Sequence, residues 1–308
     1  MRVAVVDIGT NSTRLLIADV NPDGSIAELQ RRSLVTRLGE SVDATGVLSA
    51  AAIDRVLAAL DDYAVAIEHY GADARSAVLT SAVRDAANGQ AFVALVEQRY
   101  GLQARAIPGT EEAQLTYLGA TSDGGTGTTE PTLVIDVGGG STELIVGAGA
   151  AVEFSVSLQA GVVRQSERHL HGDPPSVPEL EALGAEVASL IEDGVPPAIR
   201  RAAARAIAVG GTATSCAAID QALDPYDPAR VHGYRLPLST LKLLLARLAS
   251  MDLAERRKLR GLHPDRAPTV VAGVAILIRV LEAFELDAFE ASEHDILRGV
   301  ALHSAGVA

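Results

Sequence analysis

Lysine and cysteine are scarce in this 308-residue chain, and each shortage restricts what the protein can be. One cysteine, Cys216, cannot form an intrachain disulfide, so a cytoplasmic location is expected. Only Lys242 and Lys258 are lysines among 26 basic residues. A site for an anion would therefore be built from arginine, backbone N–H groups and hydroxyls.

Net positive charge and long apolar runs are also missing. The formal net charge is −13, which argues against binding a nucleic-acid polymer but leaves room for local anion sites. The longest uncharged apolar helix candidate covers residues 267–278 and is too short to cross a bilayer, which needs about 18 residues. We therefore expect neither membrane association nor a signal peptide, since Asp7 interrupts the first apolar run.

The length exceeds the size at which one hydrophobic core usually stops growing, so two domains are expected. The polar, glycine-rich segment 121–132 is the best linker candidate, which places domains at 1–122 and 123–293. Apolar periodicity predicts a helix from Ser49 to Tyr70 with Gly71 as its C-terminal cap. A shorter helix is predicted after residue 109, with Thr110 as its N-cap.

Each expected domain begins with the same pattern. Residues 3–7 and 13–20 read as strands around the turn "GTNS", and the segment "TLVIDVGGGSTELIVG" repeats this arrangement after the linker. Asp136 aligns with Asp7, and five of the eleven positions from the aspartate onward are identical. Such a long offset indicates duplication of a whole domain rather than a solenoid repeat.

A strand, an acid and a glycine turn together can bind both an anion and a cation. Glycine lets backbone N–H groups approach a ligand, and the hydroxyl and amide side chains add donors. The predicted phosphate-binding residues of the two turns are Gly9, Thr10, Asn11, Ser12 and Thr13, and Gly138, Gly139, Gly140, Ser141 and Thr142. Asp7 and Asp136 end the strands and are candidate ligands of a cation or its waters.

The copies differ where Arg14 in the first corresponds to Glu143 in the second. If the two copies face one another across a cleft, one side offers a guanidinium and the other a carboxylate. The alternative is that both side chains are solvated strand residues.

The paired "DIGTNST" and "DVGGGST" turns resemble the sugar kinase/Hsp70/actin superfamily. Within it, the chain is similar to the exopolyphosphatase/guanosine pentaphosphate phosphohydrolase (Ppx/GppA) family, in its short form without the C-terminal helical region. The motifs that carry this resemblance extend over nearly the whole chain: "TRLGE", "TSAVRDAAN", "IPGTEEAQLTYLG", "SLQAGVVRQSER", "AVGGTATS", "HPDRA" and "ASEHDILRG". The resemblance implies an α/β fold with two duplicated actin-like, ribonuclease H-like domains around an interdomain cleft. It also implies that the last helix, about 294–308, rejoins the first domain.

The resemblance also assigns roles to residues. Glu112, the second acid of "GTEEA", corresponds to the catalytic glutamate, which fits a base that activates water. Glu143 is the second essential carboxylate, and with Asp7 and Asp136 it completes the acids expected around Mg²⁺ or, alternatively, Mn²⁺. Arg84 corresponds to an arginine that contacts phosphate. Arg14, Gly210, Gly211 and Thr212 are further candidates for lining the substrate cleft, although the two glycines also suit tight packing of a helix on a strand.

The resulting hypothesis is a cytoplasmic exopolyphosphatase that releases terminal orthophosphate from inorganic polyphosphate with Mg²⁺. The alternative substrate is guanosine pentaphosphate, whose purine would need a stacking residue; no aromatic residue lies within 208–215, which favours polyphosphate. A superfamily kinase and a non-catalytic sensor of polyphosphate or alarmones are more distant alternatives. Dimerisation is common in the family and is a further expectation.

Overall fold

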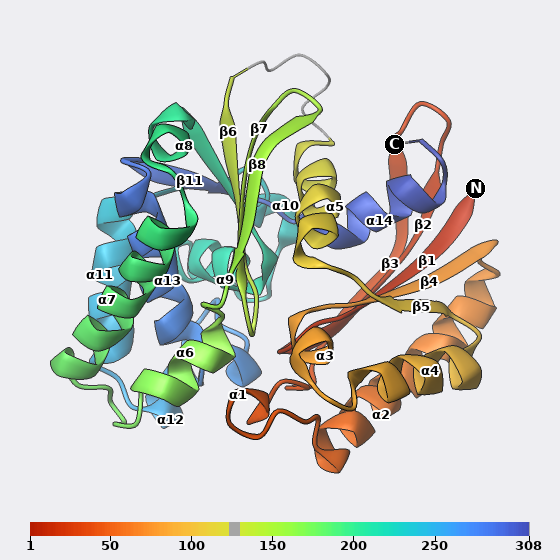
Figure 1. The fold of residues 1–308 in the computed structure, drawn as a ribbon, viewed down its shortest axis with the longest axis horizontal. Helices are drawn as coiled ribbons and strands as arrows, with labels where there is room; N and C mark the ends of the chain where they lie inside the picture. Colours follow the sequence, from red (N-terminus) through yellow and green to blue (C-terminus); the bar gives the residue numbers. More distant parts are fainter. Residues whose placement is uncertain (123–129, 308) are drawn as a thin grey trace. The chain divides into compact units, whose positions relative to one another are not determined.

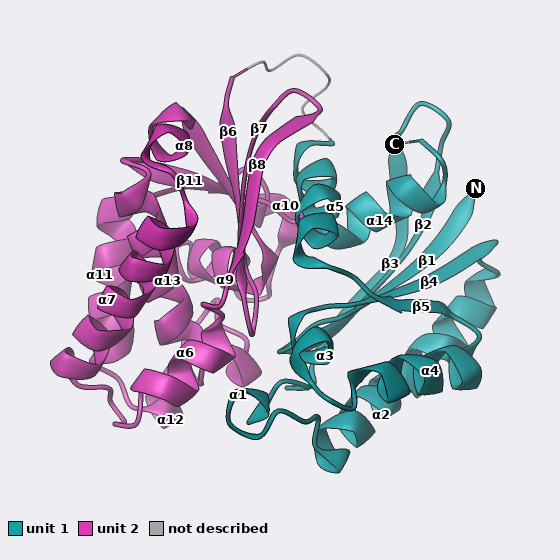
Figure 2. Ribbon diagram, in the orientation of Figure 1, with its two compact units in different colours: residues 1–122, 295–308 teal, residues 123–294 magenta. Residues whose placement is uncertain are grey.

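The computed structural model describes residues 1–122 and 130–307, which form two compact units (Figure 2). Unit 1 comprises Met1–Ser122 and Asp295–Ala308, and unit 2 comprises Asp123–His294. Most of the linker predicted at 121–132 lies outside the described residues.

The sheet of unit 1 has the strand order β3-β2-β1-β4-β5 (Figure 1). Strands β1, β2 and β3 are antiparallel, whereas β4 and β5 continue the sheet in parallel with β1. The strands span Arg2–Ile8, Ser12–Val20, Ile26–Val35, Ala74–Leu79 and Gln103–Ala106. The helices are α1 (Val42–Thr45), α2 (Ala50–Tyr70), α3 (Ser81–Asp85), α4 (Gly89–Tyr100), α5 (Gly109–Thr121) and α14 (Ile296–Ser304).

Alternating side chains of β1 supply two cores in unit 1. Ala4 and Val6 pack with Leu60 of α2 on one face, and Val3 and Val5 pack with α5 and α14 on the other. Because successive strand residues point to opposite faces, one apolar strand serves both helix layers. The C-terminal helix α14 therefore closes a core that begins with the first strand of the chain.

Unit 2 repeats this strand order and adds one strand. Its sheet order is β10-β11-β9-β6-β7-β8, with β6, β7 and β8 antiparallel and β9 and β11 parallel to β6. Strands β6 to β11 span Thr132–Val137, Thr142–Ala148, Ala151–Leu158, Arg205–Val209, Arg235–Pro237 and Ala288–Ala291. The order β8-β7-β6-β9-β11 matches β3-β2-β1-β4-β5, so the expected α/β class with duplicated domains is confirmed.

The helices of unit 2 pack on its sheet around one large core (Figure 1). They are α6 (Val162–His169), α7 (Val177–Gly194), α8 (Pro197–Ala202), α9 (Gly210–Asp220), α10 (Pro228–Val231), α11 (Leu238–Ala249), α12 (Leu253–Arg256), the 3-10 helix η2 (Pro264–Arg266) and α13 (Val270–Ala283). The apolar segment 267–278 lies mostly within α13, whose residues are largely buried in this core. Across the described ranges, no helix is both long and apolar enough to span a bilayer.

The helix ends test the local predictions. The side chain of Ser49 accepts the Ala52 amide at 3.2 Å, and Gly71 adopts a left-handed φ of 63°, which confirms both predicted ends of α2. The predicted cap of α5 is wrong. That helix begins at Gly109 with Pro108 at the N-cap position, so Thr110 lies inside its first turn.

Candidate functional site

The first turn is closed by its own backbone. The Gly9 amide donates to the Ser12 carbonyl at 3.0 Å, and the carbonyls of Thr10 and Asn11 accept amides from residues 36–39. In the described structure, the amides of Thr10 and Asn11 themselves donate to no acceptor. The turn thus directs carbonyls into the fold and leaves two N–H groups for a ligand, which is the geometry of an anion site.

The second turn has the same construction. The Gly138 amide donates to the Ser141 carbonyl at 3.0 Å, and the carbonyls of Gly138 and Gly139 accept amides from the first turn of α6. The amides of Gly139 and Gly140 have no acceptor within the ranges that the structure describes. A Cβ on Gly161, the N-cap of α6, would lie 2.3 Å from the Gly139 carbonyl, so only glycine permits this close approach.

The register of the strands pairs Asp7 with Arg14 and Asp136 with Glu143. Side chains directly opposite each other on neighbouring antiparallel strands lie on the same face of the sheet. Unit 1 therefore pairs a carboxylate with a guanidinium at the position where unit 2 pairs two carboxylates. The sequence difference between residues 14 and 143 is thus a difference in the charge next to each turn.

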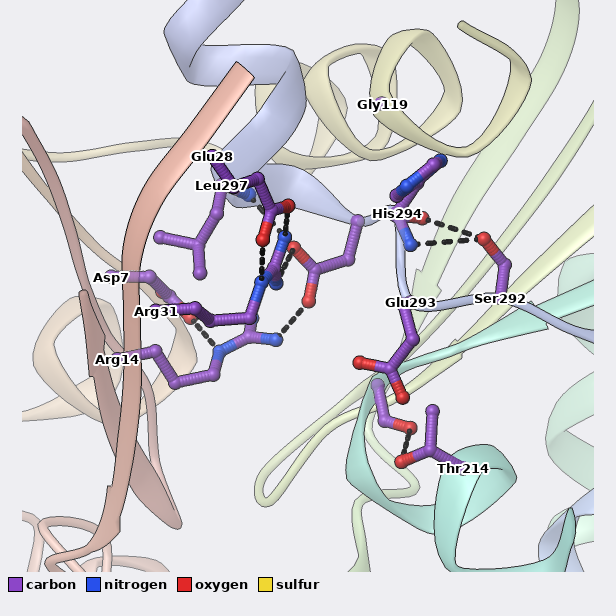
Figure 3. A network of polar contacts seen from close by, with 12 residues as sticks. Asp7, Arg14, Glu28, Arg31, Gly119, Thr214, Ser292, Glu293, His294 and Leu297 are labelled. Carbon is purple, nitrogen blue, oxygen red and sulfur yellow. Dashed lines mark hydrogen bonds and ion pairs between the residues drawn. The ribbon is translucent and has the colours of Figure 1, made fainter. Parts of the chain in front are cut away.

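In unit 1, Arg14 joins two buried acids (Figure 3). Its Nη2 lies 2.5 Å from Asp7 Oδ2, and its Nη1 contacts Asp295, the N-cap of α14. Asp7 is 3% exposed, and burial raises its pKa against the opposing effect of Arg14. The second oxygen of Asp7, Oδ1, is buried and has no hydrogen-bond partner in the described chain.

In unit 2, two hydroxyls orient Glu143, which is 1% exposed. Ser141 Oγ and Ser157 Oγ each donate to Glu143 Oε1 at 2.7 Å. Ser157 lies on β8 at the register position opposite Glu143. Both bonds converge on one oxygen, so they define the direction in which the carboxylate points.

Glu112 is 7% exposed in the first turn of α5 and forms an ion pair with Arg84 of α3. Arg84 Nη1 lies 2.5 Å from Glu112 Oε2 and also donates to the Ile107 carbonyl at 3.0 Å. Helix α3 also reaches the first turn, because the Ala82 amide donates to Thr10 Oγ1 at 3.1 Å. Local hydrogen bonds therefore connect the predicted base to the predicted anion site within unit 1.

Several predicted phosphate ligands use their hydroxyls inside the fold. Thr13 Oγ1 hydrogen-bonds Thr36 Oγ1 at 2.9 Å, and Thr142 Oγ1 donates to the Ala160 carbonyl at 2.5 Å. Both threonines are fully buried. Ser141 serves Glu143, as described above. Among the turn side chains, those of Asn11 and Ser12 stay partly exposed.

The candidates at the start of α9 lie in different surroundings. Gly210 has a left-handed φ of 77°, and a Cβ on it would lie 2.8 Å from Asp136 Oδ1, which places Asp136 at the beginning of α9. Gly211 is covered by Arg266, whose Nη1 would be 1.3 Å from an added Cβ. Thr212 packs against Gly273 of α13 instead and is buried. The structure thus brings Gly210, but not the Thr212 side chain, to the acid at the end of β6.

Sequence reasoning missed several residues at these sites. Ser157, Asp295 and Arg164 each contact a predicted site residue or turn, but each comes from a distant element. It also missed Tyr226, which contacts Glu293 and lies near Thr214 of α9. Ser157 and Arg164 lie in the motif "SLQAGVVRQSER", which was the one sequence signal that could have marked them.

The acids fit a cation that is bound partly by water and substrate. No group of three or more His, Cys, Asp or Glu side chains suited to a metal occurs in the described residues. Mg²⁺ usually takes one or two carboxylates and completes its shell with waters and phosphate oxygens. The opposed acids Asp136 and Glu143 match that donor set, because the register places two carboxylates side by side on one face of the sheet. Asp7 fits less well because Arg14 engages one of its oxygens.

Known proteins match over almost the whole chain. Exopolyphosphatase 2 of Mycobacterium tuberculosis is 38% identical over 322 residues, which cover 99% of both chains. A crystal structure of an exopolyphosphatase from Cytophaga hutchinsonii has a TM-score of 0.90 at 25% identity, covering 100% of this chain and 99% of that one. The Aquifex aeolicus PPX-GPPA enzyme has a TM-score of 0.82 at 30% identity, covering 98% and 99%. The pattern of the Ppx/GppA phosphatase family matches residues 16–306.

These matches define the protein as a hydrolase of phosphoanhydride bonds. More particularly, the chain belongs to the Ppx/GppA phosphatase family. The family resemblance and the enzyme class inferred from the sequence are thereby confirmed.

Proposed function

We propose that this protein is an exopolyphosphatase that hydrolyses the terminal phosphoanhydride of inorganic polyphosphate. The ion pair between Glu112 and Arg84 is the observation that carries the proposal, because it supplies a buried, oriented carboxylate next to an anion-binding turn. The name of the M. tuberculosis relative supports the choice of substrate.

Glu112 acts as the general base for water in this proposal. Hydrolysis requires a water aligned with the terminal phosphorus and a base within hydrogen-bond reach of that water. Arg84 keeps the Glu112 carboxylate in one orientation through its bonds to Oε2 and to the Ile107 carbonyl. Both bonds use Nη1, and among the described residues Nε and Nη2 of Arg84 have no acceptor, so these groups are proposed to make the predicted contact with phosphate oxygens.

The turns bind phosphate groups of the substrate through backbone amides. Thr10 and Asn11 provide two N–H groups in unit 1, and Gly139 and Gly140 provide two in unit 2. Such donors are fixed before the substrate arrives, so they stabilise the charge of the transition state without rearrangement. Phosphoryl transfer depends mainly on positioning and charge neutralisation, so no protein nucleophile is needed.

Asp136 and Glu143 would hold Mg²⁺ beside the second turn of unit 2. Asp7 Oδ1 is a separate candidate donor to a cation beside the first turn of unit 1. The ion would neutralise negative charge on the phosphate oxygens. Ser141 and Ser157 direct Glu143 by binding its Oε1. The hydroxyls thus set the orientation of one acid, and the register of β6 and β7 sets its spacing from the other.

Guanosine pentaphosphate is the second candidate substrate, and one observation now favours it. Tyr226 is 45% exposed, and the Thr214 side chain of α9 opposes the rise in its pKa that burial causes, so an aromatic ring does lie near the segment 208–215. The absence of an aromatic residue from the local sequence is therefore no argument against a purine. An exposed ring can stack on a base and contribute about 1–3 kcal/mol to its binding.

A phosphate-release assay tests the mechanism. Orthophosphate is measured from long polyphosphate, short polyphosphate, guanosine pentaphosphate and ATP, each with and without Mg²⁺. Glu112→Gln should lower kcat by about 10²–10⁴, the usual contribution of a general base. Glu111→Gln is the matched control, since Glu111 is the neighbouring acid and pairs with Arg105 at the edge of the unit. Release from none of the substrates, or equal loss in both variants, would contradict the proposal.

Tyr226 variants separate the two substrates. If guanosine pentaphosphate is the substrate, Tyr226→Ala should raise its KM about tenfold or more, whereas Tyr226→Phe keeps the ring and should stay near the wild-type value. For polyphosphate, both variants should have the wild-type KM. The ratio of the two KM changes therefore identifies which substrate uses this ring.

A further inference from the structure

Unit 2 carries a short basic segment, residues 256–260, with the sequence "RRKLR" at the end of α12. Arg257, Lys258 and Arg260 are exposed, and their side chains have no hydrogen-bond or ion-pair partner among the residues that the structure describes. The whole chain has a formal net charge of −13. Three neighbouring cations without a counter-charge therefore form a local positive surface on an acidic protein.

The acids at the start of α12 are bonded to backbone amides rather than to these cations. Asp252 Oδ1 accepts the Glu255 amide at 2.8 Å, and Glu255 Oε2 accepts the Asp252 amide at 3.0 Å. This reciprocal capping box uses both carboxylates to begin the helix. The positive charge of the basic segment is therefore not neutralised by the acids that precede it.

Buried side chains hold the backbone of the basic segment in place. Arg256 is 6% exposed and donates to Asp173 Oδ1 at 2.9 Å and to the Leu248 carbonyl at 3.4 Å. Leu262 is buried in the core of unit 2, and Leu259 packs against that core. The exposed cations thus alternate with buried anchors. Because the backbone is ordered before a ligand arrives, binding at this segment costs less conformational entropy.

The basic segment lies beside α9, whose start adjoins Asp136. Directly after the segment, Gly261 has a left-handed φ of 84°, and a Cβ on it would lie 2.3 Å from the Ala218 carbonyl of α9. Arg266 covers Gly211 at the start of the same helix. Ala218 lies about two turns, or about 10 Å, beyond Gly211. The chain that follows the basic segment therefore returns along α9 to the acid at the end of β6.

We propose that Arg257, Lys258 and Arg260 bind phosphate groups of a long polyphosphate chain beyond those held at the second turn. This inference rests on the proposed function, because it concerns more distant parts of the same substrate. Tripolyphosphate is too short to fill the turn and also reach cations about two turns along α9, whereas a chain of tens of phosphates can do both. Flexible, exposed cations suit a repeating anion, since no single geometry is required. The basic segment therefore favours long substrates and takes no part in the activation of water.

Phosphate release from long polyphosphate and from tripolyphosphate, both with Mg²⁺, tests this inference. The full chain carrying Arg257→Gln with Arg260→Gln is compared with the chain carrying Arg257→Lys with Arg260→Lys. For long polyphosphate, the glutamine pair should raise KM about 3–30-fold at unchanged kcat, because two exposed ionic contacts are lost, and the lysine pair should stay within about threefold of wild type. For tripolyphosphate, both pairs should change KM less than about twofold, since charges beyond the ligand are screened.

The salt dependence of KM provides a second readout. For long polyphosphate, the slope of log KM against log salt concentration should fall by about 0.7 for each contact that is lost, the value for single-stranded nucleic-acid polyanions. For tripolyphosphate, the slope should stay at the wild-type value. An unchanged slope for long polyphosphate would contradict direct contact between these cations and the substrate.

Arg201→Gln with Arg230→Gln is the charge-matched control. Both arginines are exposed on other helices of unit 2, α8 and α10, and their side chains have no partner in the described ranges. This pair changes the net charge as much as the glutamine pair does, but it should change KM for long polyphosphate less than about twofold. An equal rise in the control would overturn the inference, because total charge and not the basic segment would then be responsible.

The outcomes also separate this inference from the proposed function. If the unsubstituted chain releases orthophosphate from neither polyphosphate, the proposed function fails and the role of the basic segment fails with it. If both are hydrolysed and the glutamine pair keeps the wild-type KM for long polyphosphate, the role of the basic segment alone is overturned. Equal rises in KM for the two substrates would also overturn it, because the effect would then lie where the short substrate binds.

Discussion

The two turns share a backbone and differ in the charge placed beside it. Each is closed by an amide-to-carbonyl bond of 3.0 Å, from Gly9 to Ser12 and from Gly138 to Ser141. Beyond each turn, the strand register sets Arg14 opposite Asp7 but Glu143 opposite Asp136. The backbone geometry is therefore independent of the sign of the neighbouring charge, which left that charge free to diverge after duplication.

The groups that donate hydrogen bonds to the turn carbonyls also differ between the two units. Backbone amides of residues 36–39 satisfy the carbonyls of the first turn, whereas the start of α6 and the Arg164 side chain satisfy those of the second. In unit 1 the acid is neutralised within the protein by Arg14. In unit 2 two hydroxyls orient Glu143, the acid at the corresponding strand position to Arg14.

Removing Arg14 should have the largest effect, because it would leave two buried acids without their shared cation. Arg14→Met should cost about 3–5 kcal/mol in the free energy of unfolding of unit 1, measured by urea denaturation. Arg2→Met is the control: Arg2 and Asp19 are also register partners on β1 and β2, but both are well exposed, so the loss should stay below about 1 kcal/mol. Similar losses in the two variants would contradict the buried role of Arg14.

The Arg14 effect should depend on pH. Burial raises the pKa of Asp7 in the folded protein, and the removal of Arg14 would raise it further. A group with a raised folded pKa supports folding below its unfolded pKa of 3.8 and loses that contribution as pH rises through the folded value. The deficit of Arg14→Met should therefore be small near pH 4 and grow towards neutral pH. A deficit independent of pH would show that packing, not charge, is responsible.

Replacing the strand-end aspartate of either unit by asparagine should change the response to Mg²⁺ by different amounts in the two units. Asp136→Asn should raise the Mg²⁺ concentration for half-maximal activity about 10–100-fold, by analogy with the loss of one partner around a metal. Asp7→Asn should raise it less, because Arg14 already engages one oxygen of Asp7. Direct Mg²⁺ binding by calorimetry provides the readout besides activity. Equal shifts in the two variants would mean that the acids serve the cation equivalently.

Ser157→Ala should have a smaller effect on turnover. Removing one hydroxyl from the Glu143 carboxylate should lower kcat about 10–100-fold, since hydrogen bonds to charged groups contribute about 1.5–3 kcal/mol. KM should change little if the hydroxyl only orients Glu143. Ser155→Ala on the same strand is the control, because Ser155 lies opposite Ile145 instead of an acid. If both variants lose activity alike, Ser157 acts through the strand and not through Glu143.

The threonine hydroxyls should matter least for activity. Thr142→Val and Thr13→Val should each lower the free energy of unfolding by about 1–3 kcal/mol, because each leaves a buried polar partner unsatisfied. Their KM values should stay near wild type, since both hydroxyls bond within the fold. An increase of tenfold in KM without loss of stability would instead support their predicted role as phosphate ligands.

Local signals were sufficient for much of the fold. The two turns, the duplication and the ends of α2 all follow from residues close together in the chain, such as Ser49 and Gly71 around an apolar period. The cap of α5 was mispredicted because Pro108 sets the start of that helix one residue before Thr110. Local patterns therefore located this element while missing its exact first residue.

The side-chain contacts of the candidate site could not be predicted from local sequence patterns. Arg14 and Asp295 are 281 residues apart, and Arg84 reaches Glu112 across 28 residues. Tyr226 lies outside the segment in which an aromatic residue was sought, yet the folded chain brings it to Thr214. Such pairs depend on how helices pack and on strand register, which no local pattern encodes.

By itself the sequence determined the repeated strand–acid–turn unit, because glycine conformation and strand periodicity are local properties of the chain. It also determined that arginine must supply most of the positive charge. Only the tertiary structure decided which of these charges neutralise one another inside the protein and which face a turn. The physical reason is that a charge acts through its nearest neighbours, and for Arg14, Glu143 and Arg164 those neighbours come from different elements of the fold.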